Sequence, residues 1–489
     1  MKRKMTRVIA MAMAAITAVG FAGCGSQDDT TQGTTAGTTE GTTASAAGED
    51  VTEPATEEAD AYTVLTDENG EVYDLGGMEI IIRDWWSSSE ETEPENAYEE
   101  AQQEYRDWIQ ETYNFTIKEM AISDWGSTPE DFLNYATTGG DENYIFTLRQ
   151  GAELVAAMNS GLMYDLSTLD CLDFSEEKWR SGIHELMSKD GAIYGMRGID
   201  PEPRGGMYFN KRLLEEAGVN PEDLYTWQEN GEWTWDKFEE VCAQVQRDIN
   251  NDGTVDIYAM VQQGSVFLEE AVYSNNGEFI GLAEDGTYYN DLESNETMEA
   301  LNWAVEMRAQ YEMPQPEDSE WDFFLAEFVN GSAAFMADQA YRAGQDYSTM
   351  TDDFGFVCFP MGPQADDYTN CYTDNPYVIP ACYDEQKAWN LAFAYNLYTE
   401  PVPGFEDSDN WKSDYYGNFR DTEAVDYTIA RMVENGMVTY HTMIPGLDLG
   451  ADILWSLGSP DENGVVQTVA QAAESIRNTW QAYLDEANQ

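Results

Sequence analysis

The sequence predicts an α/β fold, and two stretches in which strands and helices alternate carry that prediction. Residues 78–83 (MEIIIR) form a short apolar run typical of a strand, an amphipathic helix follows, and residues 115–122 form a second run. Residues 205–210 and 257–262 are two more such runs, with two helical segments between them. Because a strand, a helix and a strand in succession imply parallel pairing through a right-handed crossover, we expect mostly parallel sheets flanked by helices.

Helix signals separate the strands of the second stretch. Residues 211–217 (KRLLEEA) are good helix formers, and Gly218 stands where a left-handed cap would end the helix. Thr234 is suited to cap the N-terminus of a second helix. Apolar residues then recur at steps of three and four, which predicts that one face of this helix is buried. The predicted face consists of Trp235, Phe238, Val241, Cys242, Val245 and Ile249.

Length, composition and charge narrow the class of protein. Residues 62–489 are long enough for two or three domains, and a chain with 42% hydrophobic residues can bury a sizeable core. The chain has 93 Asp and Glu against 24 Lys and Arg, giving a formal net charge of -69. This charge argues against a nucleic-acid partner, which requires clustered Lys and Arg to neutralise phosphates. We interpret the excess as a solvated acidic surface, with a cationic ligand as the alternative.

The N-terminus resembles a bacterial lipoprotein signal peptide. Residues 2–7 hold four Lys or Arg, and residues 8–19 form an apolar segment too short to span a bilayer. Ala22 and Gly23 then lead into Cys24. The resemblance implies that residues 1–23 are removed and that a lipid on Cys24 anchors the protein to the outer face of the cell membrane. An ordinary signal peptide with an incidental Cys is the alternative.

Residues 24–61 are interpreted as a tether between the lipid and the folded part. They are rich in Thr, Gly, Ala, Ser, Glu and Asp and nearly devoid of aromatic and branched aliphatic side chains. Such a segment cannot bury enough apolar surface to fold. We therefore expect the folded part to begin at residue 62.

A long signature in the second stretch carries a family resemblance. The segment YFNKRLLEEAGVNPEDLYTWQENGEWTWDKFEE, followed by DINNDGTVDIYAM, resembles the central signature of the extracellular solute-binding proteins of family 1. This family comprises the sugar-type receptors of ABC importers and includes the maltose-binding proteins. The resemblance implies a two-lobe, type II periplasmic-binding-protein-like fold, in which each lobe is a doubly wound, mostly parallel sheet flanked by helices.

The resemblance also implies where the chain divides between the lobes. Residues 62–203 and 361–411 are expected to form the first lobe, and residues 204–360 and 412–489 the second. Residues 354–361 (FGFVCFPM) are interpreted as the strand that returns the chain to the first lobe.

Residues from the first lobe and the hinge are expected to face the cleft between the lobes. Trp85 and Trp86 follow the first strand, and ligands of open α/β sheets bind beyond the carboxyl ends of the strands. The resemblance places Arg149 and Gln150 in a loop that faces the cleft, and it places Arg204 at the hinge.

The second lobe is expected to supply an aromatic ring. The segment FVNGSAAFMADQAYRAG resembles the part of the family that ends in a residue stacking on the ligand. This resemblance places Tyr341 against the ligand, with Asp338 and Arg342 beside it. A tyrosine on the outer surface is the alternative.

An Asp- and Asn-rich loop at residues 248–256 matches part of a calcium-binding loop. Its oxygen-bearing side chains have the spacing of the first nine positions of an EF-hand, around a Gly that permits a sharp turn. The bidentate carboxylate of the twelfth position is missing, since Ala259 stands there. A structural calcium site and a plain Asx-rich turn are therefore equally open. The candidate calcium ligands are Asp248, Asn250, Asp252, Thr254 and Asp256.

The remaining motifs argue against most enzyme chemistry. The sequence has no G-x-S-x-G elbow, P-loop, C-x-x-C or H-E-x-x-H motif, and its 2 histidines argue against a histidine-based metal or nucleophile site. We expect no cofactor other than the calcium considered above. A glycosidase needs only two well-placed carboxyl groups, so it stays the enzyme alternative. A disulfide between Cys358 and Cys371 is left open.

We therefore expect a protein that binds its ligand without turnover. Two hinged lobes would close on an oligosaccharide, and the closed form would dock on the permease of an ABC importer. The 14 Trp, 29 Tyr and 19 Phe allow ring faces to stack on the C–H faces of sugars, while planar Asn, Asp and Arg groups bond the hydroxyls. A monomer is expected. The alternative ligand is another polar solute, such as a peptide or an amine.

Overall fold

The computed structural model describes residues 62–489 apart from short gaps. The gaps are residues 89–93, 95, 150–151, 199–201, 373–374, 406–408 and 461–463. The predicted signal peptide, Cys24 and the tether precede residue 62 and lie outside the described residues, as does Gln150. Residues 62–489 form one unit by their internal contacts.

The first sheet is built from the apolar runs near the start of the described chain. β1 (Met78–Asp84) lies between β2 (Phe115–Ala121) and β3 (Asn143–Thr147), and it is parallel to both. β13 (Tyr377–Val378) comes from much later in the chain and pairs antiparallel with β3. The strand, helix and strand predicted at the start of the fold are thus confirmed, including their parallel pairing.

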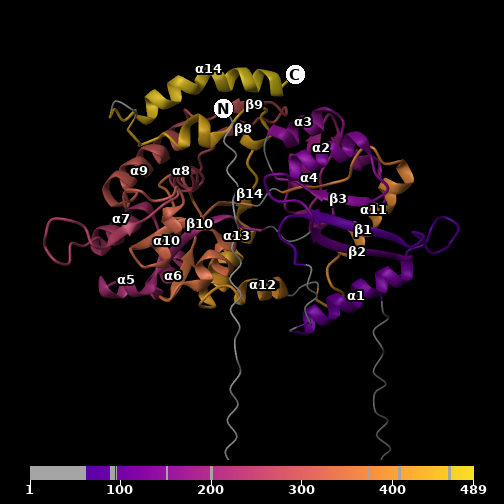
Figure 1. Ribbon diagram of the computed structural model, residues 1–489, viewed down its shortest axis with the longest axis horizontal. Coiled ribbons are helices and arrows are strands. Elements are labelled where there is room, and N and C mark those ends of the chain that lie inside the picture. The colour runs from indigo at the N-terminus through magenta and orange to yellow at the C-terminus, as the bar shows by residue number, and fades with distance from the viewer. Residues whose placement is uncertain are drawn as a thin grey trace, which may run out of the picture. The chain divides into compact units, whose positions relative to one another are not determined.

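The crossover from β1 to β2 is α1 (Ala97–Tyr113), which runs beside these two strands (Figure 1). The side chain of Asn96 caps the helix by accepting a hydrogen bond from the backbone N–H of Glu99. Asn114 ends it in the left-handed conformation, at φ 54°. The residues of its buried face pack into the core of the first sheet, and they are Tyr105, Ile109 and Tyr113.

Further elements complete the first lobe. Its helices are α2 (Thr128–Thr138), α3 (Ala152–Asn159), α4 (Ile183–Leu186) and α11 (Glu385–Tyr398), with the short helical turns η1 (Leu166–Thr168) and η2 (Glu177–Trp179) and a hairpin of β4 (Ser188–Lys189) and β5 (Ala192–Ile193).

The second sheet is built around β6 (Gly205–Asn210), which is buried along its whole length. β6 pairs antiparallel with β10 (Ala333–Gln339) and with β11 (Phe354–Val357), while β7 (Tyr258–Met260) is parallel to β10. The expectation of a mostly parallel sheet is therefore wrong for this lobe. The reason is that β6 runs away from the crossing between the lobes, whereas β10 and β11 run back toward it.

The helices predicted next to β6 are present with small differences at their ends. α5 (Lys211–Glu216) follows β6 directly, and α7 (Trp235–Val245) begins at Thr234, whose side chain accepts a hydrogen bond from the backbone N–H of Lys237. α7 ends before Ile249, which was expected on its buried face but is 61% exposed. The apolar periodicity of the sequence continued beyond the point where the chain turns into the Asp-rich loop.

The remaining elements of the second lobe are mainly helical. They are α6 (Glu222–Glu229), α8 (Gly264–Tyr273), β8 (Ile280–Leu282), β9 (Tyr288–Asn290), α9 (Asn295–Tyr311), α10 (Phe323–Val329), η3 (Ala340–Gly344), η4 (Asp346–Thr349), β12 (Asn370–Cys371), η5 (Asp409–Lys412), α12 (Ser413–Tyr416), η6 (Ala424–Ile429), α13 (Ala430–Glu434), β14 (Gly436–Met437), η7 (His441–Met443), η8 (Gly450–Leu454) and α14 (Val469–Ala487).

The C-terminal helix α14 packs back on the second lobe. It lies against β9, α9 and η8, and it is visible along one edge of this lobe (Figure 1). Thr468 and Gln471 form a reciprocal capping box that fixes its start. Val466 lies before the start of the helix and is 49% exposed.

The return to the first lobe occurs later than the sequence suggested. β11 belongs to the second sheet, so residues 354–361 do not form the returning strand. Met361 still pairs with Thr234, and Tyr368 packs in the core of the second lobe. The chain stays with the second lobe through Cys371, because β12 pairs with β14.

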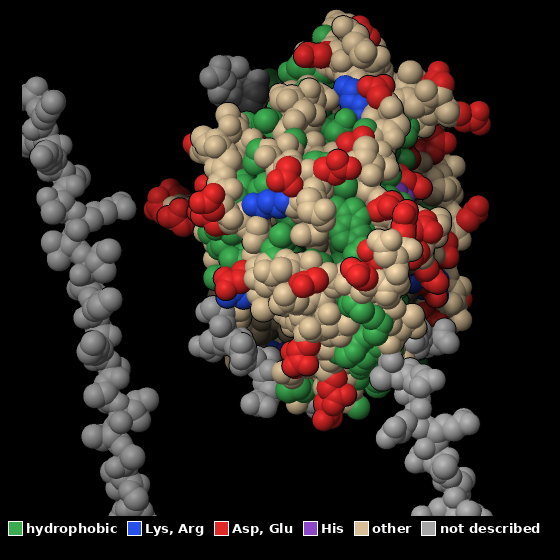
Figure 2. All heavy atoms as spheres, turned by 90° about the vertical axis from the view of Figure 1, so that its right-hand side faces the viewer, with side chains coloured by type: hydrophobic (Ala, Val, Ile, Leu, Met, Phe, Trp, Pro, Cys, Tyr) green, Lys and Arg blue, Asp and Glu red, His purple; other side chains and the backbone are tan. Residues whose placement is uncertain are grey.

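Surface charge, disulfide bonding and membrane-spanning helices were considered in the sequence-based expectations, and the structure describes all three. Figure 2 shows many Asp and Glu side chains and few Lys or Arg on one face. Within the described residues, no disulfide joins Cys358 to Cys371. No helix in the described part of the chain is both long and apolar enough to cross a membrane.

Candidate functional site

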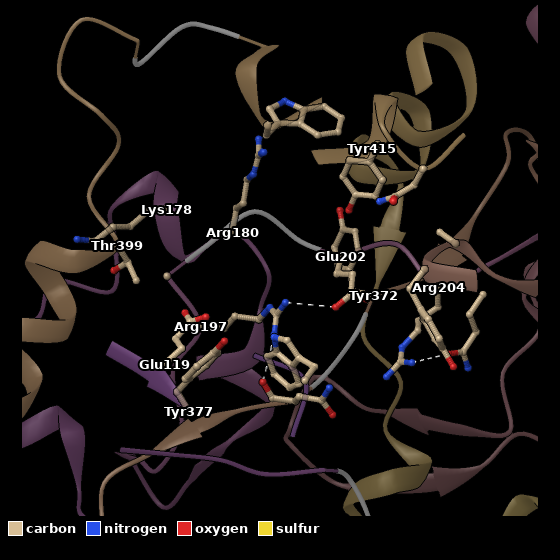
Figure 3. A pocket seen from close by; sticks show the side chains of 18 of the residues that line it. Glu119, Lys178, Arg180, Arg197, Glu202, Arg204, Tyr372, Tyr377, Thr399 and Tyr415 are labelled. Carbon is tan, nitrogen blue, oxygen red and sulfur yellow. Dashed lines mark hydrogen bonds and ion pairs between the residues drawn. The ribbon is translucent and has the colours of Figure 1, made fainter. Parts of the chain in front are cut away.

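A large cleft opens between the two sheets. Its volume is about 1770 Å³, and side chains from both lobes line it. Figure 3 shows Glu119, Arg197 and Tyr377 of the first lobe in this cleft together with Arg204 of the second. The two sheets thus place polar and aromatic groups around one space, which is the arrangement expected of a site that encloses a small ligand.

The first-lobe wall begins at the carboxyl end of β1. Trp85 and Trp86 follow the strand and both line the cleft, with ring centroids 4.8 Å apart and an interplanar angle of 87°. The turn is held by Asp84, a fully buried carboxylate that accepts hydrogen bonds from the backbone N–H groups of Trp86 and Ser87. Trp86 is 47% exposed, so its ring is available to a ligand.

Two cations of the first-lobe wall are paired with carboxylates of the protein. Arg197 is only 4% exposed, and its guanidinium lies 3.6 Å from the carboxylate of Glu202. Lys178 forms an ion pair of 2.6 Å with Glu400. Each of these cations therefore has a carboxylate partner before any ligand arrives.

Glu119 on β2 adds a half-buried acid to the same wall. Burial raises the pKa of this carboxyl, and the positive charge of Arg106 opposes that shift. The guanidinium carbon of Arg106 in turn lies 3.9 Å from the centroid of the Tyr398 ring. Arg106, Glu119 and Tyr398 all line the cleft. They form a polar floor with one aromatic face.

The second-lobe wall holds the predicted aromatic residue. Tyr341 lies in η3, directly after β10, and lines the cleft. The hydroxyl of Tyr208 fixes this turn, because it donates to the carbonyl oxygens of Gln339 and Ala340 and accepts from the backbone N–H of Ala343. The position of the Tyr341 ring thus depends on a buried hydrogen-bond network below it.

Two neighbours of Tyr341 do not reach the cleft. Asp338 is 1% exposed and accepts a hydrogen bond of 2.6 Å from Tyr347, and its carboxylate lies 3.4 Å from the guanidinium of Arg342. Arg342 also pairs with Asp346. Neither Asp338 nor Arg342 lines the cleft, so their predicted place beside the ligand is corrected. Side chains alternate along β10, and Gln339 rather than Asp338 faces the cleft.

Arg204 lies where the chain crosses between the lobes. Its backbone N–H donates to the carbonyl oxygen of Cys371, and its guanidinium donates to Gln339 at 2.6 Å. Both Arg204 and Gln339 line the cleft, as expected for Arg204 from the sequence. The crossing segment therefore presents a positive charge to the ligand space.

Two adjacent carboxyl groups on α8 complete the second-lobe wall. Glu269 and Glu270 line the cleft beside Arg204. Burial raises the pKa of Glu270 to about 8, and the neighbouring carboxylate of Glu269 raises it further, against the effect of Arg204. Burial also raises the pKa of Glu269, although a hydrogen bond from the Tyr273 hydroxyl opposes the shift.

The cleft lining does not include Arg149. Its guanidinium pairs with Glu153 at 3.5 Å and lies 4.8 Å from the Trp125 ring centroid. Trp125 itself lines the cleft, so Arg149 supports an aromatic residue of the lining instead of joining it. Gln150, predicted beside it, lies outside the described residues.

The predicted calcium loop is held together by its own side chains. Asp248 accepts hydrogen bonds from the backbone N–H groups of Asp252 and Gly253, and Asp256 accepts from those of Ile249 and Asn250. Among the described residues, no group of three or more His, Cys, Asp or Glu is placed to hold a metal ion. The calcium site stays a prediction, and the observed hydrogen bonds are those of an Asx-rich turn.

Several lining residues were not found from the sequence. They are Arg106, Glu119, Lys178, Arg197, Glu269, Glu270, Tyr372, Tyr377 and Tyr398. One signal was present: Glu269 and Glu270 interrupt an otherwise apolar helix, GSVFLEEAVY. Charged residues in the middle of a buried helix require a reason, because burying an uncompensated charge is costly.

The sequence matches one protein family and is similar to a protein of known function. Residues 104–404, more than half of the chain, match the family described as bacterial extracellular solute-binding protein. An arabinooligosaccharide-binding protein of Halalkalibacterium halodurans is 26% identical over 185 residues, which is 36% of each chain. That match thus spans just over a third of the relative's length.

Solved structures share the fold at low sequence identity. The UgpB protein of Mycobacterium tuberculosis, solved with glycerophosphocholine, is 17% identical, with a TM-score of 0.57 over 79% of this chain and 95% of that chain. The cyclic alpha-maltosyl-1,6-maltose binding protein of Arthrobacter globiformis is 14% identical, with a TM-score of 0.56 over 85% and 98%. The predicted two-lobe fold is confirmed. The chain belongs to the bacterial extracellular solute-binding protein family.

Proposed function

We propose that this protein captures a saccharide between its two lobes, outside the cytoplasm, and delivers it to the permease of an ABC importer. The observation that carries the proposal is the cleft of about 1770 Å³ with aromatic and polar side chains on both walls. This volume exceeds the roughly 300 to 1,000 Å³ usual for small-molecule pockets. It suits an oligosaccharide, or a smaller ligand once the lobes have closed.

Aromatic rings in the lining favour a sugar over other polar solutes. Trp86 and Tyr341 face the space from opposite walls. Flat rings bury the C–H faces of sugar rings, while nearby charged groups form strong hydrogen bonds with hydroxyls. Arg197 and Arg204 are placed to donate such bonds. The names of the bacterial relatives, which include an arabinooligosaccharide-binding and a maltosyl-maltose-binding protein, support the same class of ligand.

A second ligand class has one observation in its favour. UgpB, which is similar to this chain in fold, was solved with glycerophosphocholine, a solute that is not a sugar. A thermal-shift screen of the purified protein separates the two classes, because a ligand that binds only the folded state raises the melting temperature. The panel contains arabinose, maltose and galactose oligosaccharides, short peptides and glycerophosphocholine. Stabilisation by at least one saccharide is expected. Stabilisation by peptides or glycerophosphocholine alone would contradict the proposal.

We also propose that the protein binds without turnover. The matched family and the similar structures are described as binding proteins. A stabilising saccharide incubated with the protein should therefore be recovered intact. Release of new reducing ends, lost on substitution of a carboxyl group in the cleft, would instead support the glycosidase alternative.

The lipid anchor is a further part of the proposal. Ala22, Gly23 and Cys24 follow the apolar segment of the leader in the pattern of a lipoprotein signal peptide. Expressed in a bacterium with this leader, the protein should fractionate with membranes, and Cys24→Ser should release it or leave it unprocessed. Membrane association of a fully processed Cys24→Ser variant would count against the anchor.

A further inference from the structure

The two glutamates on α8, Glu269 and Glu270, include a buried oxygen without a hydrogen-bond donor in the described part of the chain. Glu270 is 5% exposed and lines the cleft, yet no described group donates a hydrogen bond to its buried Oε2 atom. Glu269 lies beside it and accepts a hydrogen bond of 3.1 Å from the Tyr273 hydroxyl. A carboxyl group in this condition is unusual, since buried polar atoms in proteins nearly always have partners.

The charged and titratable groups around the pair do not neutralise it. Arg204 faces it from the crossing segment, but the guanidinium already donates to Gln339 at 2.6 Å. Tyr273 faces it from the same helix and stays protonated, because burial raises its pKa well above the ordinary value. Among the described residues, no Lys or Arg nitrogen forms an ion pair with Glu269 or Glu270, whereas Lys178 and Arg197 across the cleft are both paired.

The fold leaves room for the Glu270 carboxyl group at the crossing between the lobes. A Cβ atom on Gly205 would lie 1.7 Å from its Oε1 atom, so the absence of a side chain at this position lets the carboxyl group rest on the backbone. Gly205 begins β6, which is buried throughout. The carboxyl group therefore sits at a fixed point, between a rigid strand and the ligand space.

We propose that Glu269 and Glu270 bind an ammonium group of the ligand, so that the captured solute is an amine-bearing saccharide. This inference rests on the proposed function and narrows its ligand class. An ammonium offers three donors and a positive charge, and it can satisfy both carboxyl groups at once. A neutral hydroxyl would satisfy one oxygen but would supply no positive charge to the pair.

The electrostatics of the pair agree with this assignment. Two carboxylates that share a desolvated site repel each other, and one of them takes up a proton. Such a proton is retained by Glu270, whose pKa burial raises to about 8. An arriving ammonium would replace this proton as the compensating charge. The acidic pair of the second wall thus becomes the feature that selects the ligand.

A matched pair of ligands tests the inference. A glucosamine trisaccharide and its fully N-acetylated counterpart share ring size and length, but only the first carries ammonium groups. Calorimetry with the purified protein should show affinity at least about tenfold higher for the amine. Glu270→Gln should weaken binding of the glucosamine trisaccharide more than binding of the N-acetylated one, so that most of that preference is lost. Glu278→Gln is the control, since burial raises the pKa of Glu278 as well but its side chain lies outside this cleft.

Proton release gives a second measurement that a merely structural carboxyl group would not change. At pH 6.5 both Glu270 and an amine of pKa about 8 are protonated, so forming the ion pair should release about one proton per ligand. Calorimetry in buffers of different ionisation enthalpy measures this number. It should fall toward zero in Glu270→Gln.

Each outcome bears on one of the two proposals. Tight binding of the N-acetylated trisaccharide, or of another neutral saccharide, without any preference for amines would overturn the inference and leave saccharide capture standing. Amine binding that survives Glu270→Gln, with unchanged proton release, would also overturn it. Failure of every saccharide, amine-bearing or neutral, to bind would count against the proposed function itself.

Discussion

The two walls of the cleft differ in how their charges are balanced. On the first-lobe wall, Arg197 and Lys178 each lie against a carboxylate, and Arg106 lies over the ring of Tyr398. On the second-lobe wall, Glu269 and Glu270 have no ion-pair partner among the described residues. Arg197 and Lys178 of the first wall thus have carboxylate partners without a ligand, whereas the two glutamates of the second wall have no cationic partner among the described residues.

From this difference we infer that one wall selects the class of ligand and that the other fixes the orientation of its rings. Charges that are already paired keep their positions and can donate directed hydrogen bonds without reorganising. Unpaired buried carboxyl groups are destabilised in the empty protein, and a ligand that compensates them gains that energy on binding. We therefore expect the first wall to fix the orientation of the sugar rings and the second to choose among ligands by charge.

The largest expected effect is on the pH dependence of stability. Glu270 has a folded-state pKa of about 8, above the roughly 4.3 of an unfolded glutamate, so the folded state holds an extra proton between these values. Its contribution to the free energy of unfolding is fully present below about pH 4 and is lost as the pH rises through 8. Between pH 5 and 8 the free energy of unfolding should fall by roughly 3 kcal/mol more in the unsubstituted protein than in the Glu270→Gln variant.

Chemical unfolding of both proteins at several pH values measures this difference. Many other carboxyl groups titrate in the same range, and subtraction of the variant removes their contribution. Parallel curves for the two proteins would mean that Glu270 is not set apart from the ordinary acids, and the contrast between the walls would then disappear.

The next effect is on ligand affinity through Tyr341. Removing a ring that lines the cleft deletes stacking area, so Tyr341→Ala should weaken saccharide binding by roughly 1 to 3 kcal/mol, or about ten- to a hundredfold. The melting temperature should change little, because this side chain lies at the cleft surface. Calorimetry and thermal unfolding measure the two quantities separately.

Tyr347 is a matched control six residues further along the chain. It is fully buried and donates to the carboxylate of Asp338, so Tyr347→Ala should lower the melting temperature strongly. Unchanged affinity together with a strongly lowered melting temperature in Tyr341→Ala would place Tyr341 with the core residues instead of the ligand.

Much of the fold could be predicted from local sequence signals. The apolar run at β1 and the Thr234 cap are both set by patterns within a few residues. Strand direction in the second sheet was not predicted, because it depends on which of β6, β10 and β11 run toward the crossing between the lobes. That is a property of the whole path of the chain.

Apart from Arg204, which precedes β6, the lining residues that were predicted from the sequence follow a strand end. Trp85, Trp86 and Tyr341 come directly after strands, and all three line the cleft. Asp338 was misplaced because one residue along a strand reverses the face on which a side chain lies. Glu119 and Arg197 were missed, since nothing in their local sequence distinguishes a charged residue that faces the cleft from one that faces solvent.

The smallest expected effect concerns Arg149 and tests whether this residue belongs to the first wall of the cleft. The resemblance to the family placed this residue against the ligand, but its guanidinium pairs with Glu153 and lies over the ring of Trp125. Arg149→Gln removes the charge and keeps a side chain that can still pack on the ring. Because an ion pair with an exposed carboxylate contributes only about 0.2 to 1 kcal/mol, affinity for a saccharide should change less than about threefold. Calorimetry measures this directly, with Trp125→Ala as the comparison that should weaken binding more. A tenfold loss of saccharide affinity in Arg149→Gln would mean that the guanidinium contacts the ligand when the lobes close. The first wall would then include a cation that leaves Glu153 and Trp125 to bind the sugar.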